Sequence, residues 1–260
     1  MKIGFNKYQG TGNDFIIIDN RNSIFNPENH ALINKLCDRR FGIGADGLIL
    51  IGRSAEYDFE MIYFNSDGFK GTMCGNGGRC TADFAVRKGI AGKKLRFIAA
   101  DGVHDALSEK GLIRLKMNDV KNITTVKGNY FINTGSPHYV VFTSGLDLID
   151  VPVEGKKVRW SEDFQPGGTN VNFVEIQDNG IFVRTFERGV EDETLSCGTG
   201  VTASAIASVL SGHFVSGPVN VTTKGGNLTV SFDILEDRIT NIWLSGPATF
   251  VFEGSINILP

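Results

Sequence analysis

The sequence predicts a mixed α/β (α+β) protein built as two similar halves, each a β-rich unit around a central helix. Three observations lead to this prediction. The chain contains many short apolar runs bounded by Gly, Asn, Asp or Pro, which is typical of strands. Few helical patterns interrupt these runs. Two segments that read Cys-Gly-x-Gly, and continue into small residues, begin at Cys74 and Cys197.

The duplication extends beyond the cysteines. Three pairs of positions repeat along the chain: Gly12 and Gly135, Asn65 and Glu187, and Cys74 and Cys197. The offset is 123 residues for the glycines and the cysteines, and 122 for Asn65 and Glu187, which each close an apolar run. Offsets that agree to within one residue at three places indicate two homologous halves. We expect the junction near residues 118–127.

Three helices are predicted between the strands. Residues 29–40 place Leu32, Ile33 and Leu36 on one face, as in an amphipathic helix. Residues 77–88 and 200–210 follow the two cysteine motifs and are rich in alanine and other small residues. Small side chains suit a helix that a sheet encloses, so these two are the predicted central helices.

Composition excludes several classes of protein. A net charge of −3 gives no electrostatic footprint for nucleic acid or an anionic membrane. No apolar run approaches the roughly 18 residues of a membrane-spanning helix. The N-terminus starts directly with strand-like alternation, so we expect no export signal and a cytoplasmic location with reduced thiols. The four cysteines match no zinc or Cys-x-x-Cys spacing, so we expect no metal site.

The cysteines divide into two kinds. A free cysteine is most often a small buried hydrophobe, and this is the interpretation for Cys37 and Cys80. Cys74 and Cys197 differ, because glycines at the next position and again two later let backbone N–H groups approach a ligand closely. A helix N-terminus can also lower a thiol pKa, and lowering it from about 8.5 to about 7 corresponds to roughly 2 kcal/mol.

Two opposed thiols suit one type of reaction, the inversion of a stereocentre that bears an acidic C–H. One thiolate removes the proton from one face, the other thiol delivers a proton to the opposite face, and the roles exchange in the reverse direction. A carbon beside a carboxylate is a weak acid, so the developing enediolate needs stabilisation. Backbone N–H groups at two helix N-termini could supply it, in a site that excludes water.

The motifs around these cysteines resemble those of the diaminopimelate epimerase family, and the resemblance covers almost the whole chain. The matching segments are residues 10–15, 40–47, 65–68, 73–80, 135–138, 168–172, 187–189 and 193–200. The family fold implies two α/β units, each a β-barrel-like sheet around a central helix, with the active site in the cleft between them. It implies an N-terminal unit of residues 1–119 plus 248–260, and a C-terminal unit of residues 120–247.

The resemblance implies an isomerase that interconverts LL- and meso-2,6-diaminopimelate in lysine and peptidoglycan precursor biosynthesis. It implies no cofactor, no metal and a homodimer. Cys74 and Cys197 would be the two bases, with supporting catalytic roles for His138 and Glu187. The implied substrate contacts are Asn13, Asn65, Gly75, Asn76, Asn170, Glu187, Arg188, Gly198 and Thr199. Arg188 could pair with a distal carboxylate, and Glu187 could accept from a distal ammonium.

Alternatives stay open for several residues and for the function. His138 precedes an apolar strand and could be structural, Glu187 and Arg188 could form a surface ion pair, and Asn65 could only form a turn. The residues read as structural are Asp46, Asp67 and Arg79. The chain departs from the family pattern at Ser136, at Gly47 and in the loop 190–194. Rival functions are proline racemase or hydroxyproline epimerase, a phenazine-biosynthesis type of isomerase, and a non-catalytic amino-acid-binding protein.

Overall fold

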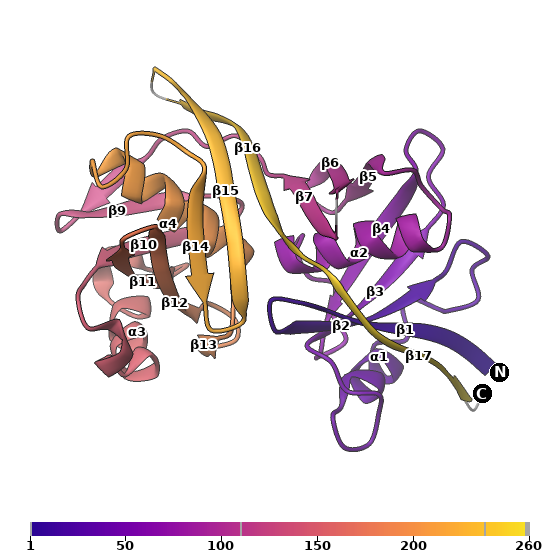
Figure 1. Ribbon diagram of the computed structural model, residues 1–260. Coiled ribbons are helices and arrows are strands. Elements are labelled where there is room, and N and C mark those ends of the chain that lie inside the picture. The colour runs from indigo at the N-terminus through magenta and orange to yellow at the C-terminus, as the bar shows by residue number, and fades with distance from the viewer. Residues whose placement is uncertain (1, 110, 237, 258–260) are drawn as a thin grey trace. The chain divides into compact units, whose positions relative to one another are not determined.

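The computed structural model describes residues 2–109, 111–236 and 238–257, and the chain packs as two compact units. Unit 1 comprises Met1–Leu115 and Gly246–Pro260, and unit 2 comprises Lys116–Ser245. Each unit combines a curved sheet with two α-helices (Figure 1). The mixed α/β class expected from the sequence is confirmed.

Unit 1 contains eight strands in its described part. They are β1 (Lys2–Gly10), β2 (Asn13–Asp19), β3 (Gly47–Gly52), β4 (Phe59–Asn65), β5 (Lys94–Ala99), β6 (Gly102–Glu109), β7 (Leu112–Lys116) and β17 (Thr249–Asn257). The pairing order is β17-β1-β2-β3-β4-β5-β6-β7. The β2–β3 and β4–β5 pairs are parallel, and the other pairs are antiparallel. The last strand of the chain therefore pairs with the first.

Unit 2 repeats this order. Its strands are β8 (Thr124–Val126), β9 (Asn129–Asn133), β10 (Pro137–Phe142), β11 (Asn170–Gln177), β12 (Gly180–Glu187), β14 (Val219–Thr223), β15 (Gly226–Leu235) and β16 (Arg238–Pro247). They pair in that sequence, and β10–β11 and β12–β14 are the parallel pairs. A short strand, β13 (Asp192–Thr194), adds to β12. Strand β8 takes the place beside β9 that β17 takes beside β1.

The register repeats as well as the order. Strand β2 pairs with β3 so that Phe15 lies opposite Gly47, and β10 pairs with β11 so that His138 lies opposite Asn170. Both members of the second pair follow those of the first by 123 residues. The same spacing that relates the two cysteines therefore relates the sheet positions next to them.

A central helix lies inside each sheet. Helix α2 (Gly75–Arg87) contacts β1, β2, β3, β4, β6 and β17, and α4 (Gly198–Leu210) contacts β9, β10, β11, β12, β14 and β15 (Figure 1). Their glycine, alanine, serine and threonine residues allow this close enclosure. The sequence placed the helices at residues 77–88 and 200–210, but both begin two residues earlier. The N-cap residues are consequently the two cysteines.

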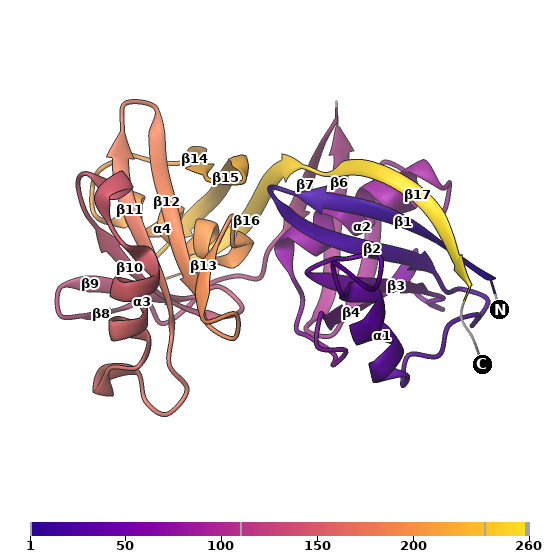
Figure 2. The same cartoon turned by 90° about the horizontal axis from the view of Figure 1, so that it is seen from below.

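A second helix covers the other face of each sheet (Figure 2). In unit 1, α1 (His30–Cys37) buries Ile33 and Leu36 against Ile16 and Leu48.

Among the described residues, no helix is long and apolar enough to span a membrane.

The second helix of unit 2, α3 (Val151–Arg159), was missed from the sequence because it has a proline and few apolar residues. Its start carries a recognisable signal. The side chain of Asp150 accepts from Val153 N at 3.1 Å, and proline is well tolerated in the first helical turn. Short 3₁₀ helices flank it at Leu146–Leu148 and Glu162–Phe164.

Candidate active site

Cys74 and Cys197 occupy the same structural position in the two units. Each is the N-cap of its central helix, with extended backbone at φ −106°, ψ 121° for Cys74 and φ −119°, ψ 112° for Cys197. Neither side chain caps the helix, and each carbonyl accepts the first helical N–H, at 2.7 Å from Gly78 and 2.8 Å from Val201. Helix N-termini favour negative charge, so this position favours a thiolate and an anionic ligand group.

The other two cysteines are buried, as the sequence predicts. Cys37 is 3% exposed and Cys80 is fully buried. Burial raises the pKa of the Cys37 thiol to about 12, and it also raises the pKa of Cys80. Both thiols are therefore protonated at neutral pH and are inert packing groups.

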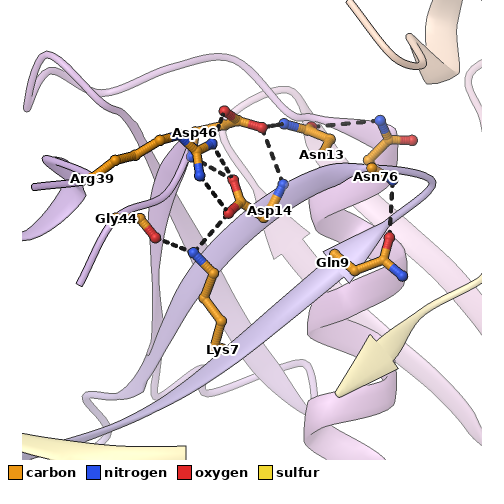
Figure 3. A network of polar contacts seen from close by, with 9 residues as sticks. Lys7, Gln9, Asn13, Asp14, Arg39, Gly44, Asp46 and Asn76 are labelled. Atoms are coloured by element: carbon orange, nitrogen blue, oxygen red, sulfur yellow. Dashed lines mark hydrogen bonds and ion pairs between the residues drawn. The ribbon is translucent and has the colours of Figure 1, made fainter. Parts of the chain in front are cut away.

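In unit 1, Asn13 connects the thiol to the first turn of α2. Its Oδ1 lies 3.5 Å from Cys74 Sγ. The same Oδ1 lies 3.5 Å from Asn76 Nδ2, and Asn13 Nδ2 donates to Asp46 Oδ2 at 2.7 Å (Figure 3). Because a carboxylate only accepts hydrogen bonds, Asp46 orients the Asn13 amide with its oxygen toward Cys74.

An ion-pair network holds Asp46 in place (Figure 3). Arg39 donates to Asp46 Oδ1 at 2.7 Å and to both carboxylate oxygens of Asp14, and Lys7 pairs with Asp14 at 2.7 Å. Although burial opposes ionisation, the bonds from Arg39 and Lys7 lower the pKa of Asp14 to about 2. Asp46 is structural by the sequence prediction, and in the structure it bonds directly to Asn13.

Arg79 is a second residue whose connection to the site the sequence did not reveal. Its side chain is fully buried, and its guanidinium donates to Asn76 Oδ1 at 3.0 Å, Thr11 Oγ1 at 3.2 Å and Gly75 O at 3.4 Å. Burial lowers the pKa of Arg79. Its position three residues after Asn76 on a helix is the signal that could have indicated this contact.

In unit 2, a histidine and a threonine connect to the thiol. Cys197 Sγ lies 3.4 Å from Thr199 Oγ1, and Thr199 Oγ1 lies 2.9 Å from His138 Nε2. The other ring nitrogen, His138 Nδ1, accepts from Asn172 Nδ2 at 3.0 Å. His138 is fully buried, and burial lowers its pKa to about 3, so its ring is neutral at physiological pH.

Asn170 and Arg188 lie beside this group. Asn170 is buried and uses Nδ2 to donate to Ser136 Oγ at 2.7 Å and Pro137 O at 2.8 Å, while its Oδ1 accepts from Arg188 N at 2.9 Å. Asn170 thereby ties the loop before β10 to the residue after β12. The Arg188 side chain is exposed and donates to Gly167 O at 3.3 Å.

The remaining site candidates are at strand ends. Asn65 is the exposed last residue of β4, and its carbonyl accepts from Gly68 N at 3.0 Å in a turn. Glu187 is the half-buried last residue of β12, the matching strand. The structure therefore assembles Asn13, Gly75 and Asn76 around Cys74, and His138, Gly198 and Thr199 around Cys197. Substrate contacts of all these residues stay predictions.

Gly200 and Gly77 are equivalent glycines with different surroundings. A Cβ at Gly200 would lie 2.4 Å from Asn172 Oδ1 and 3.2 Å from His138 Cε1. A Cβ at Gly77 would lie 3.2 Å from the terminal methyl carbon (Cδ1) of Ile49 and 3.3 Å from that (Cε) of Met61. The sequence predicts that such glycines let a ligand approach the backbone, and Gly200 also makes room for two polar side chains.

We therefore expect Gly200→Ala to lower the free energy of unfolding by about 1–3 kcal/mol, because buried polar groups must move. Gly77→Ala should change it by less than about 1 kcal/mol, because flexible side-chain ends can yield and alanine is the better helix former. Urea denaturation of both variants measures the difference. Equal losses at the two positions would contradict the distinction.

The buried neutral His138 predicts a pH dependence of stability. Its pKa is about 3 in the folded protein against 6.5 for the exposed side chain, so only the unfolded chain binds this proton between those values. The free energy of unfolding should therefore fall as pH falls from 6.5, by about 1.4 kcal/mol per pH unit from this residue. Urea denaturation between pH 6.5 and 4.5 should show a shallower slope for His138→Gln than for the unmodified protein. Identical slopes would show that His138 is not the source.

Comparison with known proteins gives a consistent family. The diaminopimelate epimerase family model matches residues 5–123 and 130–251. A diaminopimelate epimerase from Flavobacterium psychrophilum is 52% identical over 252 residues, covering 96% of this chain and 98% of that protein. Another, from Chlorobaculum tepidum, is 46% identical over 259 residues, covering 96% of this chain and 99% of that protein.

Solved structures with the same fold are more distant in sequence. A Bacillus anthracis phenazine biosynthesis protein of the PhzF family has a TM-score of 0.81 at 15% identity, covering 99% of this chain and all of that one. A probable proline racemase from Agrobacterium radiobacter has a TM-score of 0.70 at 14% identity, covering 99% of this chain and 94% of that one. At these identities the likeness concerns the fold alone.

The paired cysteine helices and the duplicated fold, together with the named relatives, define an isomerase of the racemase and epimerase class. Within that class, the chain belongs to the diaminopimelate epimerase family.

Proposed function

We propose that this protein interconverts LL-2,6-diaminopimelate and meso-2,6-diaminopimelate, in lysine and peptidoglycan precursor biosynthesis. The observation that carries the proposal is the repeated placement of a cysteine at the N-cap of a buried central helix, at Cys74 and at Cys197. The match to diaminopimelate epimerases over nearly the full chain is the reason for proposing diaminopimelate as the substrate.

The proposed reaction is a proton transfer by two bases. One cysteine thiolate takes the α-proton from one face of the carbon and becomes a thiol, leaving the electron pair in an enediolate. The other cysteine thiol then donates its proton to the opposite face and becomes a thiolate. Backbone N–H groups at Gly75, Asn76, Gly198 and Thr199 would hold the α-carboxylate and stabilise its added charge.

The residues at the strand ends would recognise the distal amino-acid group. Arg188 is exposed and can offer its guanidinium to the distal carboxylate, and Glu187 can accept from the distal ammonium. Asn13, Asn65 and Asn170 would complete the substrate contacts. Asn170 bonds to Ser136 Oγ and to the backbone N–H of Arg188. These bonds support an indirect contribution of Asn170 to substrate binding, because they fix the position of the Arg188 backbone.

His138 and Glu187 would support catalysis. As a buried neutral ring in contact with Thr199, His138 is suited to orienting Thr199, and its low pKa makes it unsuited to taking the α-proton itself. A cytoplasmic location, a homodimer and independence from cofactors complete the proposal. We also propose that the units carrying Cys74 and Cys197 descend from one duplicated ancestor.

Three rival functions fit parts of the same site. Proline racemase and hydroxyproline epimerase chemistry also needs two thiols, but those substrates have no distal ammonium or carboxylate for Glu187 and Arg188. An isomerase of the phenazine type would leave the two cysteines without a purpose. A binding protein without turnover would keep the residues around Cys74 and Cys197 for binding and would not catalyse proton transfer.

Proton NMR of LL-diaminopimelate in D2O with reduced protein tests the proposal. We expect loss of the α-proton signal and appearance of the meso isomer. Exchange of proline or hydroxyproline, with none of diaminopimelate, would replace the substrate and keep the two-thiol chemistry. Binding of diaminopimelate without any exchange would reject the enzymatic function.

A further inference from the structure

A chain of hydrogen bonds behind Cys197 extends deeper than the residues assigned to the site. Thr185 Oγ1 donates to Asn172 Oδ1 at 2.9 Å, and Asn172 Nδ2 donates to His138 Nδ1 at 3.0 Å. The chain continues from His138 Nε2 to Thr199 Oγ1 at 2.9 Å, and from Thr199 Oγ1 to Cys197 Sγ at 3.4 Å. Asn172 and His138 are fully buried, and Thr185 is 3% exposed.

Unit 1 shows that the fold does not require polar groups at these positions. In sheet register, Phe15, Ile49 and Tyr63 of unit 1 correspond to His138, Asn172 and Thr185 of unit 2, respectively. Phe15 and Tyr63 pack edge to face with ring centroids 6.1 Å apart. Two apolar side chains and an aromatic ring therefore fill this place in unit 1, whereas buried polar groups are costly unless they are fully bonded.

The hydrogen bonds from Thr185 to Cys197 all donate in the same direction, toward the sulfur. Because the Asn172 oxygen accepts from Thr185, its amide hydrogens face His138 Nδ1, which must then be unprotonated. A neutral imidazole carries its single proton on the other nitrogen, so Nε2 donates to Thr199 Oγ1. That bond occupies an acceptor position of the hydroxyl and leaves its hydrogen for Cys197 Sγ. Arg188, a cation that acts on His138, also favours the neutral ring.

We propose that Asn172 and Thr185 are positioning residues for the Cys197 thiolate, acting through His138 and Thr199. The proposal rests on the proposed function, in which Cys197 is one of the two proton-transfer groups. Asn172 and Thr185 hold His138 in its Nε2–H form, and His138 turns the Thr199 hydroxyl hydrogen toward the sulfur. A donor aimed at the sulfur stabilises the ionised form, because hydrogen bonds to charged groups are the stronger ones.

The test is site-resolved alkylation without substrate. Iodoacetamide is added across a pH range, and the peptides containing Cys197 and Cys74 are quantified by mass spectrometry. We expect Asn172→Leu to raise the pH of half-maximal Cys197 alkylation by about one unit, a roughly tenfold slower reaction at pH 7. The profile of Cys74 should not move, since its contact with Asn13, which Asp46 orients, lies in unit 1 and is untouched by the substitution.

Milder variants distinguish the loss of a hydrogen bond from a folding defect. Thr185→Val removes one hydroxyl and should shift the Cys197 profile in the same direction, and Thr185→Ser should restore it. Thr223→Val is the matched control, because Thr223 is a buried strand threonine of unit 2 whose hydroxyl donates to the backbone oxygen of Gly226 at 2.9 Å. It should lower the thermal midpoint about as much as Thr185→Val and leave the Cys197 profile unchanged.

A double-mutant cycle and a tautomer measurement complete the test. If the hydrogen bonds from Thr185 to Cys197 act as one continuous series, Thr199→Val already breaks it. Adding Asn172→Leu to Thr199→Val should then cause no further shift in the pH of half-maximal Cys197 alkylation. Imidazole ¹⁵N NMR should show His138 as the Nε2–H form in the unmodified protein and lose this preference in Asn172→Leu.

Three results would overturn the proposal: additive shifts in the cycle, an Nδ1–H form of His138 in the unmodified protein, or an unmoved Cys197 profile in folded Asn172→Leu and Thr185→Val. None of these measurements uses substrate. A failure of diaminopimelate turnover would therefore reject the proposed function separately.

Discussion

Cys74→Ser and Cys197→Ser should each lower kcat for diaminopimelate epimerisation by at least about 10³-fold, because each cysteine is the base in one direction of the reaction and the acid in the other. A serine hydroxyl keeps the shape of the side chain but is far less acidic than a thiol. Because the helix N-caps make no side-chain cap bond through sulfur, the fold should survive. Turnover by proton NMR and thermal unfolding of the same samples measure the two effects.

The buried cysteine of α1 provides the control. Cys37→Ala removes a thiol whose pKa burial raises to about 12, so its kcat should stay within a few-fold of the unmodified value. Similar losses in all three variants would mean that the assay follows stability and not proton transfer. Near-normal turnover by either serine variant would remove that cysteine from the mechanism.

Arg188→Ala should raise KM for diaminopimelate roughly 10- to 100-fold, with a smaller effect on kcat. A charge-assisted pair with the distal carboxylate is worth about 1.5–3 kcal/mol, and each 1.4 kcal/mol corresponds to a tenfold change in affinity. The side chain is exposed and donates to Gly167 O, so its removal should leave the unit folded. Steady-state kinetics in both directions measure the change.

A substrate comparison and a control variant sharpen this prediction. L-Lysine has a distal ammonium but no distal carboxylate, so any slow α-proton exchange of lysine should be equally slow with and without Arg188. Arg53→Ala is the matched control, because Arg53 is an arginine of unit 1 that likewise donates to a backbone oxygen, that of Arg21. An unchanged KM in Arg188→Ala, or an equal rise in Arg53→Ala, would place Arg188 outside the distal site.

The duplicated architecture could be predicted because its signals are local and repeated. The cysteines and their glycines repeat at one offset, and the strand pairings on either side follow the same order. Helix α3 escaped prediction because Pro152 and the charged residues after it weaken the apolar pattern, although the cap at Asp150 marked its start.

The contacts behind the cysteines could not be predicted in the same way. Asn172 and Thr185 meet because they are opposite each other on β11 and β12, and that register appears only in the folded sheet. Asp46 reaches Asn13, and Arg79 reaches Thr11, across large separations in the sequence. Motifs identify the residues at the chemistry, while sheet register and burial decide which side chains support them.

The most direct test of the two-base account follows deuterium in a reaction stopped at a few per cent conversion. LL-diaminopimelate is incubated in D2O with the unmodified protein, and the LL and meso isomers are separated and analysed by mass spectrometry. Because the donating thiol has already exchanged with solvent, the account predicts deuterium at the inverted carbon of the meso product and none in the recovered LL substrate. Deuterium appearing in recovered LL substrate as fast as in the product would mean that one base serves both faces, and would contradict the account.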